Sequence, residues 1–277
     1  MNKVLKKLLI KTKKAVFSQQ IGNNSSKFKG EGYDFVELRE YQDGEDIRKI
    51  DWTISAKMQK TFVKVFYAQR ELEIVIVPIL NGSVYFGTKI LKQEQIAQIV
   101  AILGYVSSAQ GDRFSSYIAN ETVQLNSKKT KKLLAVDKMV ESIFNYDPIG
   151  KRVDYKIIED QLFKTIKQKS IIFLIGDFFD IEALDLKLIA KKHEIIAIIV
   201  RDRFEENPIP LGGVDLVDPQ TNRNFVGNID NSVINSYRSI VEKNDKELYK
   251  KFKKAGVEFI KIYTDENPVI KLSKLFR

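Results

Sequence analysis

The sequence contains no cysteine and only one histidine in 277 residues. Without cysteine, the chain has no disulfide, no thiolate metal ligand and no cysteine nucleophile, as is common in reducing compartments. The one histidine, His193, follows Lys191 and Lys192, and we interpret it as the solvated end of a surface helix. The residues needed for a Ser-His-Asp hydrolase or a histidine-rich metal site are therefore missing. We predict a protein that is not an enzyme, with no catalytic residues.

Long apolar runs are also lacking. None approaches the roughly 20 residues of a membrane-spanning helix, so we expect a soluble, cytoplasmic protein. No glycine-rich phosphate-binding loop or dinucleotide fingerprint follows any expected strand. The chain carries a formal net charge of +10, which raises the question of nucleic-acid binding. However, most of the excess lies near the N-terminus and no nucleic-acid-binding motif is found elsewhere.

The first twenty residues predict a basic amphipathic helix. Apolar residues recur at helical spacing between six lysines, namely Lys3, Lys6, Lys7, Lys11, Lys13 and Lys14. A terminal helix of this kind commonly packs on the body of its protein, and we favour that arrangement. In the alternative, residues 3–17 contact an anionic membrane surface, which would place the protein peripherally at the inner membrane.

Beyond the basic helix, the pattern divides in two. Residues 21–70 mix short β-like runs with turn signals and predict a small β-rich subdomain. Residues 71–277 alternate buried strands (73–80, 171–175 and 195–200) with helical stretches, one of them starting near Ile181 and a long one over 231–255. This alternation predicts an α/β fold with a doubly wound, mostly parallel sheet. Pro78 should end or distort its strand because it has no N–H to donate.

The N-terminal half carries a long and specific motif. It contains Gly30-Glu31-Gly32-Tyr33-Asp34-Phe35, Leu38-Arg39-Glu40-Tyr41, Gly44-Glu45-Asp46-Ile47-Arg48-Lys49-Ile50-Asp51-Trp52 and Ser55-Ala56. With residues 111–113, 176–178, 214–218 and 263–265, this string resembles the bacterial DUF58 family, whose members carry a von Willebrand factor A-like domain. Short members of this type are often found with MoxR-like AAA+ ATPases. The resemblance therefore implies an adaptor or assembly factor with such an ATPase as its partner.

The resemblance also implies where a metal would bind. In a von Willebrand factor A domain, an Asp-x-Ser-x-Ser motif, a later Thr and a later Asp hold Mg²⁺. The corresponding residues here are Asn81, Ser83, Tyr85, Val153 and Asp177. Only Ser83 and Asp177 keep the family's residue type, and one of two carboxylates is lost. Because Mg²⁺ requires a near-octahedral set of oxygen ligands, we expect these positions to be vestigial, with no metal or other cofactor.

The charged motif has two interpretations. Arg39 and Arg48 could form forked ion pairs with Asp46 or Asp51 and fasten the small subdomain to the core. Alternatively, the motif is a docking surface, since Arg, Tyr and Trp are typical interface anchors. We favour the structural interpretation because charges at this density usually pair with each other. The residues concerned are Arg39, Glu40, Tyr41, Gly44, Asp46, Arg48, Asp51 and Trp52.

Three functions are compatible with these features. The leading hypothesis is a non-catalytic protein-interaction module that works with a MoxR-like AAA+ ATPase. The first alternative is a metal-dependent ligand binder of the von Willebrand factor A type. The second is a basic protein that binds nucleic acid or a membrane surface.

Overall fold

The computed structural model describes residues 3–22, 35–66 and 73–275, which belong to two units. The larger unit combines Met1–Asn23 with Leu72–Arg277, and we call it the α/β unit. The smaller unit, Asn24–Glu71, lies between these two segments in the sequence.

The α/β unit is built on a six-stranded sheet with the order β10-β7-β6-β3-β4-β5. Its strands are β3 (Glu73–Pro78), β4 (Arg113–Ala119), β5 (Val123–Thr130), β6 (Ile171–Gly176), β7 (Glu194–Arg201) and β10 (Glu258–Tyr263). Neighbouring strands are parallel except for β4 and β5, which form an antiparallel edge. The inner strands β3, β6 and β7 are buried along almost their whole length, which explains their continuous apolar sequences. The prediction of an α/β fold with a mostly parallel sheet is confirmed.

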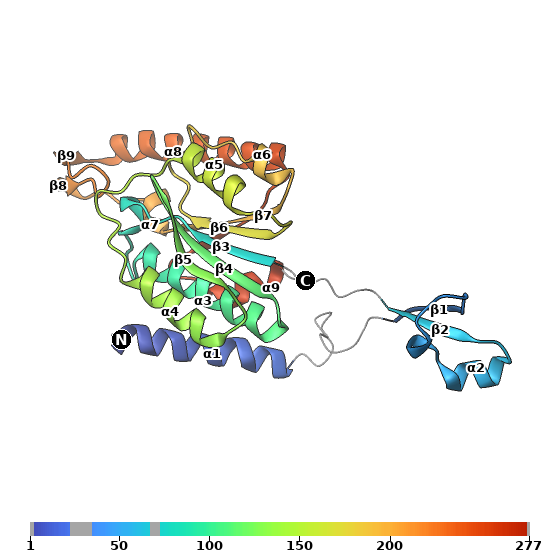
Figure 1. Cartoon of the computed structure of the whole chain (residues 1–277). Helices are drawn as coiled ribbons and strands as arrows, with labels where there is room; N and C mark the ends of the chain where they lie inside the picture. Colours follow the sequence, from blue (N-terminus) through green and yellow to red (C-terminus); the bar gives the residue numbers. More distant parts are fainter. Residues whose placement is uncertain (1–2, 23–34, 67–72, 276–277) are drawn as a thin grey trace. The chain divides into compact units, whose positions relative to one another are not determined.

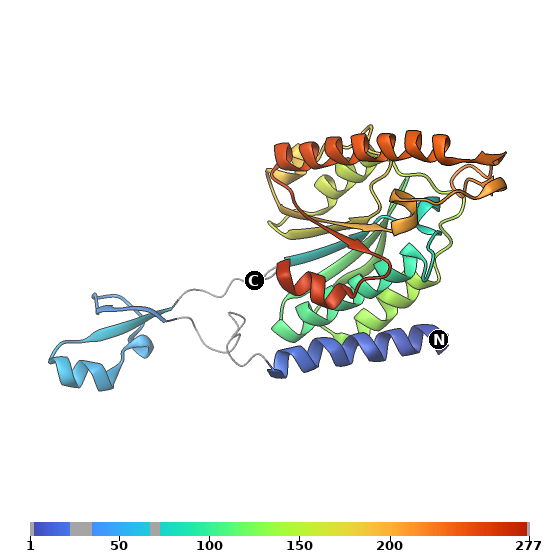
Figure 2. The same cartoon turned by 180° about the vertical axis from the view of Figure 1, so that it is seen from behind.

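Helices cover both faces of this sheet (Figures 1 and 2). One face carries α1 (Lys3–Gly22), α3 (Lys92–Gln110), α4 (Leu133–Phe144) and α9 (Pro268–Leu275), and the other carries α5 (Tyr155–Thr165), α6 (Lys187–Ala190) and α8 (Asn231–Ala255). Each face has its own buried cluster of apolar side chains. A short helix α7 (Arg203–Glu206) follows β7, and a hairpin of β8 (Gly212–Val217) and β9 (Asn224–Ile229) precedes α8.

The N-terminal helix α1 packs mainly on α3. Leu5, Leu9, Thr12 and Val16 are buried along one side of it, at the spacing of a single helix face. Docking on the body of the protein is therefore confirmed. The helix is part of the α/β unit.

Most sequence-predicted elements are present, but two local expectations are wrong. The helix expected from about Ile181 is reduced to the four residues of α6. His193 is only 3% exposed, not solvated, because the chain turns directly into β7 at Glu194 rather than ending a surface helix there. Burial lowers the pKa of His193, aided by the charge of Lys192. By contrast, β3 ends at Pro78 as expected.

The small unit pairs β1 (Phe35–Glu40) with β2 (Phe62–Phe66) in antiparallel register. Between these strands lie a short 3₁₀ helix, Ile47–Lys49, and α2 (Trp52–Met58). The Asp51 carboxylate accepts hydrogen bonds from the backbone N–H groups of Thr53 and Ile54 and so caps α2. In the part of the chain that the structure describes, no helix is long and apolar enough to cross a membrane.

Candidate functional site

The carboxyl ends of four parallel strands meet at one edge of the sheet. The residues just beyond them are Ser83 after β3, Asp177 after β6, Asp202 after β7 and Thr264 after β10. The chain leaves β3 toward β4 on one side and later returns to β6 on the other. Ligands of open α/β sheets bind at such a reversal of strand order, so this edge is the candidate site.

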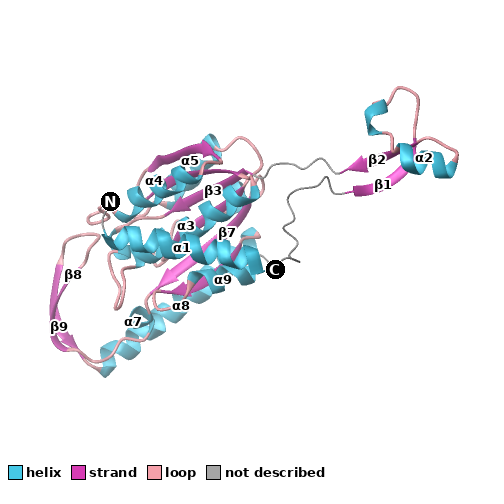
Figure 3. Ribbon diagram, turned by 90° about the horizontal axis from the view of Figure 1, so that it is seen from below, coloured by secondary structure: helices cyan, strands magenta, loops and turns pink. Residues whose placement is uncertain are grey.

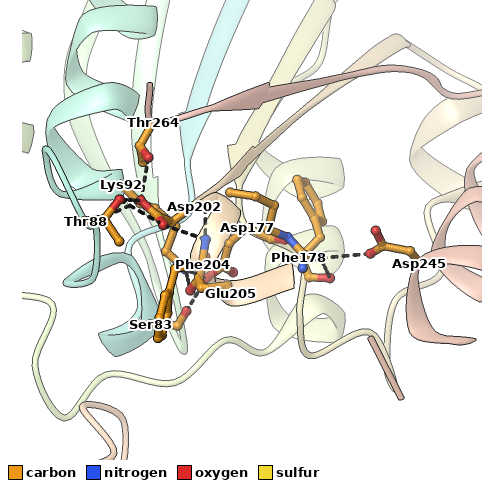
Figure 4. Close-up of polar contacts among 11 residues, drawn as sticks. Ser83, Thr88, Lys92, Asp177, Phe178, Asp202, Phe204, Glu205, Asp245 and Thr264 are labelled. Atoms are coloured by element: carbon orange, nitrogen blue, oxygen red, sulfur yellow. Dashed lines mark hydrogen bonds and ion pairs between the residues drawn. The ribbon is translucent and has the colours of Figure 1, made fainter. Parts of the chain in front are cut away.

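The centre of the site is the side chain of Lys92, the first residue of α3, which has no solvent exposure. Its Nζ donates to Asp177 Oδ2 at 2.8 Å and to Glu205 Oε1 at 2.5 Å. Ser83 Oγ donates to the same Asp177 oxygen at 2.5 Å. Figure 4 shows Lys92 held between the two carboxylates. An ammonium group therefore supplies the positive charge at this edge.

The two carboxylates have different protonation behaviour. Burial alone would raise the pKa of Asp177, but the charges of Lys92 and Arg201 and the bonds from Lys92 and Ser83 hold it below its ordinary value. The pKa of Glu205 is raised, first by burial and then by the nearby charge of Asp177, despite the effect of Lys92. Asp177 is therefore the member of the pair whose ionised form is favoured.

A second buried cation, Arg201, braces the backbone next to Asp177. Its Nε donates to the carbonyl oxygen of Asp177 at 2.5 Å, and its Nη2 lies 3.2 Å from Asp245 Oδ1 on α8. The guanidinium carbon lies 3.4 Å from the centre of the Phe179 ring, a cation–π contact. Between Asp177 and Phe179, Phe178 has a φ of 51°, in the left-handed region that non-glycine residues rarely occupy. Arg201 thus holds a strained turn that aims Asp177 at Lys92.

Asp202 ties three strand-end loops together. It has no solvent exposure. Its carboxylate accepts hydrogen bonds from the N–H and the hydroxyl of Thr88, from the hydroxyl of Thr264 at 2.6 Å and from the N–H of Phe204. These bonds lower the pKa of Asp202, outweighing the opposing effect of burial. The loop before α3 is thereby fixed to the ends of β7 and β10.

The structure gives the five sequence-predicted metal positions different surroundings. It brings Ser83 and Asp177 together. Asn81 is 2% exposed, and its Oδ1 has no hydrogen-bond partner among the described residues. Val153 packs instead against the hydrophobic cluster on the α5 side of the sheet, and Tyr85 is 49% exposed.

These residues do not fit Mg²⁺. The Asp177 oxygen that would bind the ion already accepts two hydrogen bonds, and a fixed ammonium charge next to it repels a divalent cation. Among the described residues, no group of three or more His, Asp or Glu side chains is arranged to hold a metal.

Tyr85 lines an open pocket of about 440 Å³ beside this site. Its lining includes the apolar residues Leu91, Phe144, Pro148 and Ile149 and the acidic residues Glu94 and Asp147. Burial raises the pKa of Glu94. The pocket combines an exposed aromatic ring with acidic groups, as many peptide-binding surfaces do.

The turn of the β8–β9 hairpin packs against the same edge. The N–H of Gly150 donates to the carbonyl oxygen of Pro219 at 2.8 Å. A side chain at Gly82 would collide with that carbonyl group, so position 82 requires glycine. The hairpin turn, the loop before α5 and the loop after β3 therefore form one continuous surface.

The charged motif of the small unit pairs largely with itself. Arg39 forms a forked ion pair with Glu45, and Arg48 forms another with Asp46 through two bonds of 3.0 Å. The expected Arg48–Asp46 pair is present, and Arg39 pairs with Glu45, a partner that the sequence analysis did not name. Both pairs join residues of the same unit. Trp52 is 69% exposed.

Acid is expected to destabilise the protein through Asp177 and Asp202. Because their pKa values are lower in the folded chain than in the unfolded chain, their stabilisation is complete above about pH 4. It is lost as the pH falls from there through the folded pKa values. Each proton taken up on unfolding contributes at most about 1.4 kcal/mol per pH unit to the slope of the free energy of unfolding against pH. Urea unfolding of wild type and of Asp202→Asn at a series of pH values from about pH 4 downward measures how the free energy of unfolding changes with pH. Equal slopes would contradict the assignment of Asp202.

Comparison with known proteins places the chain in a family. The model of the family described as "Protein of unknown function DUF58" matches residues 37–247, and the chain belongs to this family. Uncharacterized proteins of Mycobacterium bovis and Mycobacterium tuberculosis are 25% identical over 251 residues, covering 89% of this chain and 79% of theirs.

The solved structures that match this chain have lower sequence identity. The conserved hypothetical protein BatB of Bacteroides thetaiotaomicron is 12% identical with a TM-score of 0.45, covering 74% of this chain and 98% of that one. An aerotolerance-related membrane protein of Bacteroides fragilis is 9% identical with a TM-score of 0.45, covering 73% and 96%.

Proposed function

We propose that this chain is a non-catalytic protein-interaction module with a doubly wound, von Willebrand factor A-like fold, located in the cytoplasm. Its partner is a MoxR-like AAA+ ATPase, for which it acts as an adaptor or assembly factor. The partner and the finer fold class rest on the family resemblance of the 30–56 motif and of the strand-end residues.

The observation that carries the proposal is the buried ammonium of Lys92 at the strand-end edge. Through its bonds to Asp177 and Glu205, this ammonium group balances the negative charge of the crevice with a cation that the chain itself supplies. In the metal-binding mode that the family resemblance implies, a divalent ion with oxygen ligands would supply positive charge at this edge. Here the internal cation removes the need for a metal, so partner binding should not depend on divalent ions at this site.

The pocket around Tyr85 is the docking surface that we propose. An exposed aromatic anchor beside apolar walls provides contact area, while Glu94 and Asp147 favour a basic segment of the partner. The chemistry that fits is an apolar side chain flanked by lysine or arginine. Nothing in this arrangement supplies a nucleophile with a base, which is consistent with a binding role.

Co-purification with the MoxR-like ATPase encoded nearest to this gene tests the proposal. We expect association in at least one nucleotide state, and a Tyr85→Ala variant should bind about 30-fold more weakly, the effect of losing a hot spot of about 2 kcal/mol. Trp52→Ala is the matched comparison, since it removes an exposed aromatic side chain from the small unit.

Two results would contradict the proposal. Failure to associate in the nucleotide-free, ADP and ATP states would remove the ATPase as partner. A loss of binding in Trp52→Ala but not in Tyr85→Ala would move the docking surface to the small unit. The metal-dependent alternative is tested separately by calorimetry with Mg²⁺ and Mn²⁺ on the wild-type protein, where a clear binding isotherm would support it.

A further inference from the structure

Docking of α1 leaves its opposite side facing solvent. Along this side Lys6, Lys7, Lys11, Lys13 and Lys14 are all exposed, and α1 contains no acidic residue. Figures 1 and 2 show α1 as the outermost layer on its side of the α/β unit, and Figure 3 looks onto that side. We call this surface the α1 basic face. Packing on the body of the protein and contact with a membrane surface are therefore compatible roles for α1, because packing uses only one side of the helix.

An exposed aliphatic residue lies at the middle of this face. Ile10 is 59% exposed. Its neighbours on a helix surface are the residues three and four positions away, and here all four are lysines: Lys6, Lys7, Lys13 and Lys14. A solvated helix face has no need of isoleucine at such a position.

The helix α4, which contacts α1, begins with the same pattern. Leu133 is 37% exposed and Leu134 is 66% exposed. They follow directly on Lys131 and Lys132, which are also exposed. Exposed leucines next to lysines repeat the chemistry found around Ile10, in an element that packs beside α1.

We propose that the α1 basic face, with the first turn of α4, binds an anionic lipid surface. Lysine ammonium groups are attracted to lipid phosphates, while their methylene stems and the exposed aliphatic side chains suit the acyl boundary below. A nucleic acid would match the charge but would gain nothing from Ile10 and Leu134. The face also has no arginine, the side chain that most often reads base edges in the major groove. This inference goes beyond the proposed function and does not depend on it.

Co-sedimentation of the full chain with vesicles tests this proposal. Vesicles of phosphatidylcholine alone are compared with vesicles that also contain phosphatidylglycerol. We expect binding only to the latter, decreasing as salt screens the charges. The variant Lys7→Gln/Lys11→Gln/Lys14→Gln should bind roughly a hundredfold more weakly, since each lysine contributes about fivefold at an anionic surface. Ile10→Ser, which leaves the charge unchanged, should weaken binding several-fold.

A matched control removes three exposed lysines from another helix of the same unit. The variant Lys243→Gln/Lys246→Gln/Lys250→Gln on α8 has the same change in net charge, and it should keep nearly all of the vesicle binding. Three results would overturn the proposal. They are no binding to anionic vesicles, equal losses in the two triple variants, and an unaltered Ile10→Ser variant combined with tight binding of duplex DNA in the same buffer. The last result would identify the face as a nucleic-acid surface.

Discussion

Replacing Lys92 by methionine is expected to lower the free energy of unfolding by about 3–5 kcal/mol at pH 7, the cost of removing one partner from a buried ion pair. Methionine nearly matches the shape of the lysine chain, so packing is conserved while the charge is lost. Asp177 and Glu205 would then face each other without the ammonium that lies 2.8 and 2.5 Å from them. Neither could regain water without opening the end of α3.

Urea unfolding monitored by circular dichroism measures this effect. Lys89→Met is the matched control, because Lys89 is exposed on the loop that leads into α3, and it should change stability by less than about 0.5 kcal/mol. The destabilisation by Lys92→Met should diminish as the pH is lowered. The pKa of Glu205 is already raised, and protonation of Glu205 relieves the unpaired charge. A loss below about 1 kcal/mol at pH 7 would show that Lys92 is not the essential cation of the site.

A double variant separates the ion pair from simple packing. Asp177→Asn removes one of the two charges that Lys92 neutralises, so Lys92→Met should cost less in that background than in wild type. Additive losses from the two changes would mean that Lys92 and Asp177 do not interact energetically. Such additivity would contradict the 2.8 Å bond between them.

The sequence predicted the edge of the site but not its centre. Ser83 and Asp177 follow recognisable strands, and the structure joins them directly. Lys92 was missed because a lysine at the start of a helix is usually a solvated residue. A signal for it was present, since Lys92 lies four residues before Ile96 and seven before Ile99, in phase with the buried stripe of α3. A charged residue in phase with a core stripe indicates a buried partner.

Glu205 also had a detectable signature. It lies three residues after Asp202, and the two form a capping box at the start of α7. That pattern predicts the helix start but not the second role of Glu205 as a partner of Lys92, which depends on the meeting of α3 with the end of β7. Such contacts between distant segments follow from topology rather than from local pattern.

The fold was predictable where periodicity was long and regular. The 25 residues of α8 match the predicted helix over 231–255, and the buried strands β3, β6 and β7 were found from their apolar runs. The failures at His193 and at the helix expected from Ile181 share one cause. In the segment 181–193, Ile181, Leu184, Leu186 and Ile189 are buried without forming one continuous helix. Apolar residues alone therefore did not reveal the local structure, which depends on how the neighbouring elements pack.

Substitution at two positions is expected to create a metal-binding donor set at this edge. The variant Asn81→Asp/Lys92→Ala would place a new carboxylate at position 81, where the present amide oxygen is buried without a hydrogen-bond partner. It would also remove the ammonium from between Asp177 and Glu205. Together with Asp177, Glu205 and the Ser83 hydroxyl, the new carboxylate would supply oxygen donors of the kind that Mg²⁺ or Mn²⁺ prefers.

We expect this double variant to bind Mn²⁺ with a dissociation constant of about 0.1–1 mM, typical of weak oxygen sites. In the absence of metal it should be less stable than wild type, because its carboxylates repel one another. Mn²⁺ at a hundredfold excess over the dissociation constant should restore about 2.7 kcal/mol. Isothermal titration calorimetry and thermal unfolding with and without Mn²⁺ measure both effects.

The single variant Asn81→Asp provides the decisive comparison. It supplies the missing carboxylate but keeps Lys92, so the internal ammonium still occupies the site and Mn²⁺ should neither bind nor stabilise. If Asn81→Asp alone bound Mn²⁺ as tightly as the double variant, Lys92 would not be the group that replaces the metal. If the double variant failed to bind while remaining folded, Asn81 and Asp177 would not face a common site. Binding by the double variant but not by Asn81→Asp would show that the Lys92 side chain prevents Mn²⁺ from binding once the carboxylate at position 81 is present.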